Sequence, residues 1–95
     1  MKIGKDMCHI YKEGDVEFSI EVTQSQTREE VIKQYIQRRK EKGLTQEELA
    51  KRAGIPRTNI TRFESGHYNP SLEMLVRIAA AMDMEVEVHL VPKKD

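Results

Sequence analysis

A short polar run near the middle of this 95-residue chain carries side chains that can read the edges of nucleic-acid bases. The run consists of Arg57, Thr58, Asn59, Thr61 and Arg62. Arginine can pair with guanine and asparagine with adenine through two hydrogen bonds each, and a threonine methyl group can contact thymine. An ordinary solvated face is the alternative interpretation, but such a face rarely combines so many base-reading groups. The run therefore predicts contact with bases or phosphates.

The charge distribution supports this interpretation, although the formal net charge of the chain is zero. Residues 27–66 carry a net charge of +4, whereas residues 1–26 and residues 67–95 each carry −2. A phosphate-facing surface requires such a local excess of positive charge. A mixed-charge surface can give the same asymmetry by chance. The charge pattern is therefore supporting evidence only.

A short helix followed by a tight turn is predicted directly before the polar run. Thr45 and Glu48 have the spacing of a capping box, in which each side chain accepts a hydrogen bond from the other residue's backbone N–H. Gly54 is expected to end this helix, because glycine accepts the left-handed backbone conformation at no steric cost. The expected buried face consists of Leu49, Ala50 and Ala53.

The polar run itself is predicted to lie on the next helix, which opens at Pro56 and stops at Ser65 and Gly66. Ile60 and Phe63 would anchor this helix and leave its polar side free. Two short helices joined by a glycine turn have the geometry in which the second helix enters the major groove of DNA.

Two further helices are expected on either side of this pair. A capping box at Thr27 and Glu30 predicts the start of the first one, and Gly43 predicts its end. Pro70 and Ser71 are expected to start the last one. The side chains of the last helix that are expected to face the core are Leu72, Leu75, Val76, Ile78, Ala79 and Met82.

Strands are predicted at both ends of the chain. Apolar and polar residues alternate over Val16–Val22, with Met7–Tyr11 as the expected partner strand of a hairpin, and they alternate again over Met84–Val91. The predicted organisation is a hairpin extension over 1–26, a helical domain over 27–84, and a strand and tail over 85–95. The fold class is thus mainly α, with about four helices.

Other classes of function find little support in the sequence. No apolar stretch reaches the roughly 18 residues of a membrane span, and Met1–Ile10 does not resemble a signal peptide, so a cytoplasmic location is expected. The single cysteine, Cys8, has no partners at zinc-ligand spacing, and no nucleophile stands beside a base. Neither a metal, a cofactor nor an enzyme activity is predicted.

Residues 32–84 resemble the Cro/repressor (XRE) family of helix-turn-helix domains. The matching motifs are Gly-Leu-Thr-Gln-Glu-Glu-Leu-Ala at 43–50, Ala-Gly-Ile at 53–55, Ile-Thr-Arg-Phe-Glu-Ser-Gly at 60–66 and Pro-Ser-Leu-Glu-Met-Leu at 70–75. The resemblance implies a lambda-repressor-like fold and double-stranded DNA as the ligand. Pro56 departs from the family pattern, in which a serine often caps the third helix.

The resemblance also implies roles for individual residues. Gln46 would brace a phosphate, residues after the third helix such as His67 and Tyr68 would approach the DNA backbone, and Arg39 would pair with Glu64. Together with the polar run, the expected DNA-binding residues are Thr45, Gln46, Arg57, Thr58, Asn59, Thr61, Arg62, Ser65 and His67.

The carboxy-terminal strand replaces the fifth helix of many family members. This ending resembles the XRE-type antitoxins of toxin–antitoxin pairs, such as the HigA-type proteins, whose partners resemble RelE-class messenger-RNA-cleaving toxins. The function implied is a homodimeric transcriptional repressor that binds a DNA operator, with an antitoxin role as a refinement. The alternative is a protein-interaction adaptor, as in the multiprotein-bridging factors.

Overall fold

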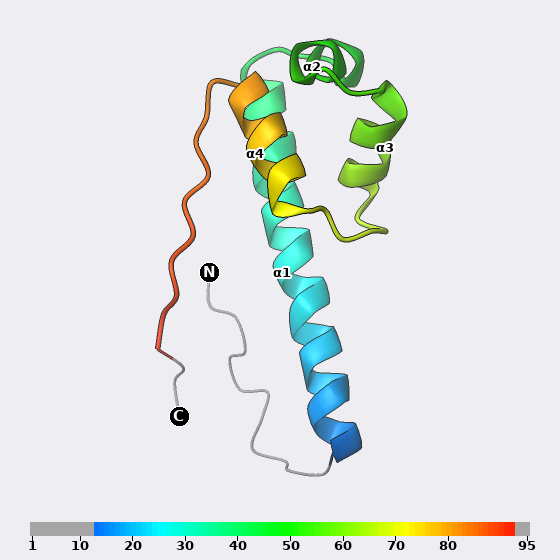
Figure 1. The fold of residues 1–95 in the computed structure, drawn as a ribbon, viewed down its shortest axis with the longest axis vertical. Coiled ribbons are helices and arrows are strands. Elements are labelled where there is room, and N and C mark those ends of the chain that lie inside the picture. The colour runs from blue at the N-terminus through cyan, green and yellow to red at the C-terminus, as the bar shows by residue number, and fades with distance from the viewer. Residues whose placement is uncertain (1–12, 93–95) are drawn as a thin grey trace. The chain divides into compact units, whose positions relative to one another are not determined.

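The computed structural model describes residues 13–92, with side chains from Ser19 onward, and it is built from four α-helices. The helices are α1 (Glu13–Glu41), α2 (Gln46–Ala53), α3 (Arg57–Ser65) and α4 (Leu72–Ala81) (Figure 1). Residues 31–87 form one compact unit, while residues 13–30 and 88–92 belong to a second one. The expected mainly helical fold is confirmed.

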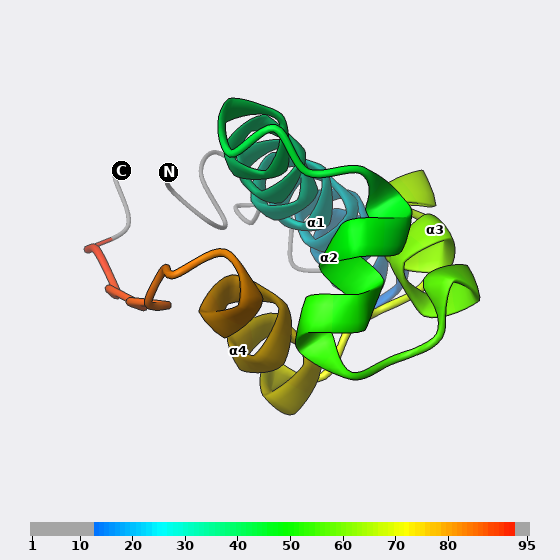
Figure 2. The same ribbon diagram turned by 90° about the horizontal axis from the view of Figure 1, so that it is seen from above.

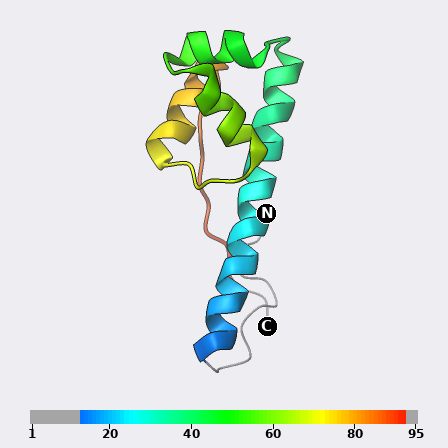
Figure 3. The same ribbon diagram turned by 90° about the vertical axis from the view of Figure 1, so that its right-hand side faces the viewer.

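The core lies in the unit of residues 31–87, where α2 contacts both α3 and α4. Figures 2 and 3 show α2 lying across these two helices. Tyr35 of α1 meets Phe63 edge to face, with ring centroids 5.1 Å apart, and its hydroxyl donates a hydrogen bond of 2.8 Å to the Leu75 carbonyl. The buried core residues are Ile32, Leu49, Ala50, Ala53, Ile60, Phe63, Ile78, Ala81 and Met82.

The ends of α2, α3 and α4 follow the local chemistry of the sequence. The Thr45 hydroxyl accepts a hydrogen bond from the Glu48 backbone N–H (3.0 Å), and the Glu48 carboxylate accepts one from the Thr45 N–H (2.9 Å), so the predicted capping box is confirmed. Gly54 has a φ of 71° and ends α2. Pro56 precedes α3, and the Ser71 hydroxyl caps α4 through the Met74 N–H at 3.1 Å.

The prediction of a strand at Val16–Val22 was wrong, because these residues belong to α1. The helix runs through the boundary expected after residue 26, and Thr27 does not cap it. Instead, the Thr27 hydroxyl donates to the Thr23 carbonyl one turn earlier, at 2.8 Å. A helix satisfies its backbone within the segment, whereas a strand requires a partner. The expected partner, Met7–Tyr11, lies outside the described residues.

The strand predicted over Met84–Val91 is not present either. Residues 84–92 contain neither helix nor strand. The Met84 N–H instead donates to the Ala79 carbonyl at 2.9 Å, which completes the turn after α4. Alternating Val86, Val88 and Leu90 fit one face of a strand, but a lone strand has no ladder to stabilise it.

Two side chains expected in the core lie outside it. Leu72 is 64% exposed and Val76 is 50% exposed, whereas Ile78, Ala79 and Met82 are buried. The buried arc of α4 is centred on Ile78 and Met82, and Leu72 and Val76 fall on the far side of the helix. Among residues 13–92, no helix combines the length and the apolar character that a membrane crossing needs.

Candidate nucleic-acid interface

The outward side of α3 brings together most of the predicted base-reading residues. Arg57, Thr58, Thr61, Arg62 and Ser65 are exposed and together line a shallow depression on this helix. They lie on the opposite side of α3 from Ile60 and Phe63, which are 0% and 1% exposed. This is the arrangement expected of a helix that is anchored on one side and available to a ligand on the other.

Asn59 lies at the flank of this surface. It is half-buried, and its backbone N–H donates to the Pro56 carbonyl at 3.0 Å in the first turn of α3. Tyr68 is also half-buried and packs against the core cluster, so its ring contributes to the fold. His67 follows the end of α3 and is exposed.

Arg39 and Glu64 form an ion pair that links α1 to the end of α3. Two bonds join the guanidinium to the carboxylate, Nε to Oε2 at 2.8 Å and Nη2 to Oε1 at 3.1 Å. A third guanidinium nitrogen, Nη1, donates to the Leu44 carbonyl at 2.8 Å. The side chains are only 12% and 7% exposed, so solvent screens this pair weakly.

Gln46, the first residue of α2, connects this ion pair to the exposed side of α3. Its Nε2 donates to Glu64 Oε1 at 2.9 Å, while its Oε1 accepts a hydrogen bond from the Thr61 hydroxyl at 3.1 Å. Glu64 and Thr61 thus hold the Gln46 amide in one orientation. The sequence did not predict these contacts, because residue spacing alone does not show how α2 crosses α3.

Three hydroxyl groups of the predicted site are engaged within the fold. The Thr61 hydroxyl lies 3.2 Å from the Arg57 carbonyl as well as near Gln46. The Ser65 hydroxyl donates to the Arg62 carbonyl at 2.6 Å and accepts from the His67 N–H at 3.4 Å. Thr45 accepts from Glu48 in the capping box, and hydrogen bonds from Thr45 hold the pKa of the Glu48 carboxyl below its usual range.

Positive charge on α3 is available for a ligand. Among the side chains described, those of residues 19–92, neither Arg57 nor Arg62 forms an ion pair, whereas Arg38 pairs with Glu41 at 3.0 Å and Lys42 with Asp83 at 2.7 Å. The Lys42 ammonium holds the pKa of Asp83 below its usual range, through a hydrogen bond first and through its charge second. The two α3 guanidinium groups are therefore free to contact an anionic partner.

Comparison with known proteins agrees with this geometry. A family described as helix-turn-helix matches residues 36–88, which is more than half of the chain. The chain belongs to the helix-turn-helix family. The expected resemblance to the Cro/repressor (XRE) type is thereby confirmed. The antitoxin-like carboxy-terminal strand is not supported.

Several relatives of this helix-turn-helix protein are named as regulators. An uncharacterized HTH-type transcriptional regulator of Methanothermobacter thermautotrophicus is 55% identical over 47 residues, which cover 50% of this chain and 68% of the relative. The ImmF control region 10 kDa protein of Bacillus phage phi105 is 43% identical over 51 residues (54% and 57%). The regulator SinR of Bacillus subtilis is 37% identical over 65 residues (67% and 56%).

The matched segments cover 56–68% of the lengths of these three relatives. No solved structure matches the chain significantly.

Proposed function

We propose that this protein is a sequence-specific DNA-binding transcriptional regulator that places α3 in the major groove. The observation that carries the proposal is the exposed side of α3, where Arg57 and Arg62 lack ion-pair partners among the described residues. Buried Ile60 and Phe63 anchor the opposite side of the same helix. A rigid helix with a cationic, hydrogen-bonding outer face is what direct readout of base edges requires.

The proposed contacts divide into base readout and phosphate positioning. Arg57, Thr58 and Arg62 would contact base edges, with Asn59 at the flank and Thr61 offering its methyl group while its hydroxyl serves Gln46. Contacts of this kind carry the sequence preference, whereas phosphate contacts set register and orientation. The residues proposed to approach phosphates are Thr45, Gln46, Ser65 and His67.

Gln46 is suited to a phosphate contact because its amide is already oriented. One N–H of Nε2 is used by Glu64, and the carbonyl oxygen accepts from Thr61. The second N–H of the amide would donate to a phosphate oxygen. A preorganised donor loses less conformational entropy on binding than a mobile one.

Repression through a homodimer is the finer form of the proposal. Two copies would place their α3 helices in the half-sites of a palindromic operator, about one helical turn of DNA apart. Affinity would come largely from lysine and arginine contacts to phosphates, so it would fall steeply as salt rises. Binding to chromosomal DNA is compatible with the expected cytoplasmic location.

The comparisons agree with the expectation that the chain is not an enzyme, because the matched family is described as helix-turn-helix and two of the relatives are named HTH-type transcriptional regulators. The adaptor alternative does not need free arginines on α3, whereas the DNA-binding proposal does. The antitoxin role rested on a strand that is not present in residues 84–92. The role therefore has no structural support and stays a prediction. Co-purification of a small basic toxin with the full chain would test that role.

Selection of bound sequences from a pool of random duplex DNA tests the main proposal. The full chain is expected to enrich a short motif, and its affinity for that motif is expected to exceed its affinity for unrelated duplex. Recovery of no motif at any salt concentration would contradict the proposal and favour the adaptor alternative.

A further inference from the structure

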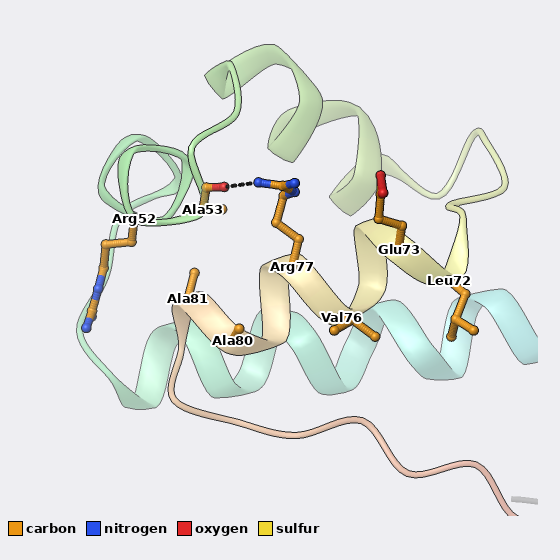
Figure 4. Close-up of a pocket in the computed structure, with 8 residues that line it drawn as sticks. All are labelled: Arg52, Ala53, Leu72, Glu73, Val76, Arg77, Ala80 and Ala81. Carbon is orange, nitrogen blue, oxygen red and sulfur yellow. Dashed lines mark hydrogen bonds between the residues drawn. The ribbon is translucent and has the colours of Figure 1, made fainter.

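The outer side of α4 carries an apolar stripe that the described part of the fold leaves uncovered. Leu72, Val76 and Ala80 recur at intervals of four residues and are all exposed. Leu72 is 64% exposed and Val76 is 50% exposed, although both are large aliphatic side chains. Together with Arg52 and Ala53 at the end of α2, these side chains line a shallow groove along α4 (Figure 4). Contiguous exposed apolar side chains that are rimmed by polar residues are a feature of interaction sites.

Two opposite charges flank the stripe on the side of α2. Figure 4 shows Glu73 and Arg77 pointing toward that side, while Leu72 and Val76 point away from it. Nη1 of Arg77 donates to the Ala53 carbonyl at 3.3 Å, which holds the guanidinium at the edge of the groove. Within residues 13–92, no ion pair joins Glu73 to Arg77 of the same helix.

We propose that the occupant of this groove is a second copy of the chain, whose α4 packs antiparallel against the first. A two-fold axis at Val76 would set the two Val76 side chains against each other. The same axis would place each Leu72 over the partner's Ala80, because these residues lie four positions before and after Val76. Large side chains would then meet small ones at both ends, which lets two helices approach closely.

The flanking charges are complementary in the same arrangement. A two-fold axis perpendicular to both helices keeps each flank on its own side, so Glu73 of one copy faces Arg77 of the partner subunit. Reversal of the helix brings the two positions within about 3 Å along the axis, given a rise of about 1.5 Å per residue. The pair forms twice, as in any isologous interface. One helix therefore supplies both the apolar seam and its matching charges.

The role of this dimer rests on the proposed function, because a palindromic operator requires a two-fold dimer. Because α4 has 10 residues and is therefore only about 15 Å long, a seam made by one helix from each copy is expected to bury less than the roughly 1,600 Å² of a standard stable interface. The dimer is therefore weak in free solution. Binding at two adjacent half-sites would strengthen it, since the second contact becomes intramolecular.

Sedimentation equilibrium of the full chain without DNA tests the seam directly. Wild-type protein is expected to dimerise within the micromolar range, and Val76→Arg is expected to weaken dimerisation at least tenfold, that is, by roughly 1.4 kcal/mol or more. Ile20→Arg is the matched control, because Ile20 is also a β-branched residue on a helix and is 51% exposed. Circular dichroism and the Tm of each variant verify that it folds.

A charge exchange between copies tests the antiparallel orientation. Glu73→Arg and Arg77→Glu are each expected to weaken self-association, because each variant sets like charges against each other in its own dimer. A mixture of the two is expected to form heterodimers beyond the statistical share in native mass spectrometry, because every cross-copy pair is then of opposite sign. An ion pair within one helix would not respond to mixing.

Each outcome supports or overturns the seam independently of DNA binding. A wild-type monomer at about 100 μM, equal losses in Val76→Arg and Ile20→Arg, or a purely statistical mixture would each overturn the inference. None of these results depends on α3. If the proposed function fails instead, sequence selection yields no motif while the heterodimer preference is retained.

Discussion

Gln46 at the start of α2 donates a hydrogen bond of 2.9 Å to Glu64 near the end of α3. The acceptor is the same carboxylate that Arg39 of α1 binds through two nitrogens. Three helices are therefore joined at one nearly buried carboxylate, directly behind the exposed side of α3. This junction fixes the orientation of the helix that we propose reads DNA.

Replacement of Arg39 is expected to destabilise the fold strongly. Arg39→Leu leaves the Glu64 carboxylate, 7% exposed, without its countercharge, and breaking a buried pair in this way costs about 3 kcal/mol. Urea unfolding at neutral pH measures the loss. The double variant Arg39→Leu with Glu64→Gln is expected to lose less than the two single variants together, because no charge is then stranded. Strict additivity would show that the two side chains are not coupled.

The arginines of α3 are expected to contribute directly to DNA affinity. Arg57→Ala and Arg62→Ala should each weaken binding to the selected motif by about 1–3 kcal/mol, with less effect on unrelated duplex if they contact bases. Fluorescence anisotropy at one fixed salt concentration measures both affinities. Arg52→Ala is the matched control, because it removes an exposed arginine from α2 rather than α3. Unchanged binding in both α3 variants would assign base readout to another surface.

The ends of α2, α3 and α4 were predictable from sequence because they depend on local chemistry. The Thr45 capping box, the Gly54 turn, Pro56 before α3 and Ser71 before α4 all involve residues within one turn of each other. Their hydrogen bonds form between neighbours in the chain, so residue type and spacing suffice to identify them. The same holds for buried Ile60 and Phe63, which the helical period places on one side.

Features that depend on distant parts of the chain were not predictable in this way. Alternation over Val16–Val22 fits a strand, yet the segment continues α1, because no local signal stops the helix between Glu13 and Glu41. Leu72 and Val76 have the apolar character of core residues, and only the packing of α4 shows that they face outward. The contact of Gln46 with Thr61 likewise depends on how α2 crosses α3.

Tyr35 is expected to ionise at unusually high pH. Burial raises the pKa of its hydroxyl from 10.0 to about 12. Since the folded-state pKa lies above the unfolded one, the resulting stabilisation is complete below pH 10 and is lost as pH rises toward 12. Absorbance titration of the tyrosinate band measures this, and Tyr35→Phe should remove the late-titrating group. If Tyr35→Phe still shows a hydroxyl that titrates at this high pH, another tyrosine has the raised pKa.

Gly54 provides a test of backbone strain without steric clash. Its φ of 71° lies in the left-handed region, yet an added Cβ would meet nothing closer than Arg77 Nη1, at 3.9 Å. Gly54→Ala is therefore expected to cost only the conformational penalty, about 1–2 kcal/mol, in urea unfolding. Gly54→Asn should cost less, because asparagine tolerates this conformation better. A loss well above that range in both variants would mean that the turn between α2 and α3 is more tightly packed than 3.9 Å allows.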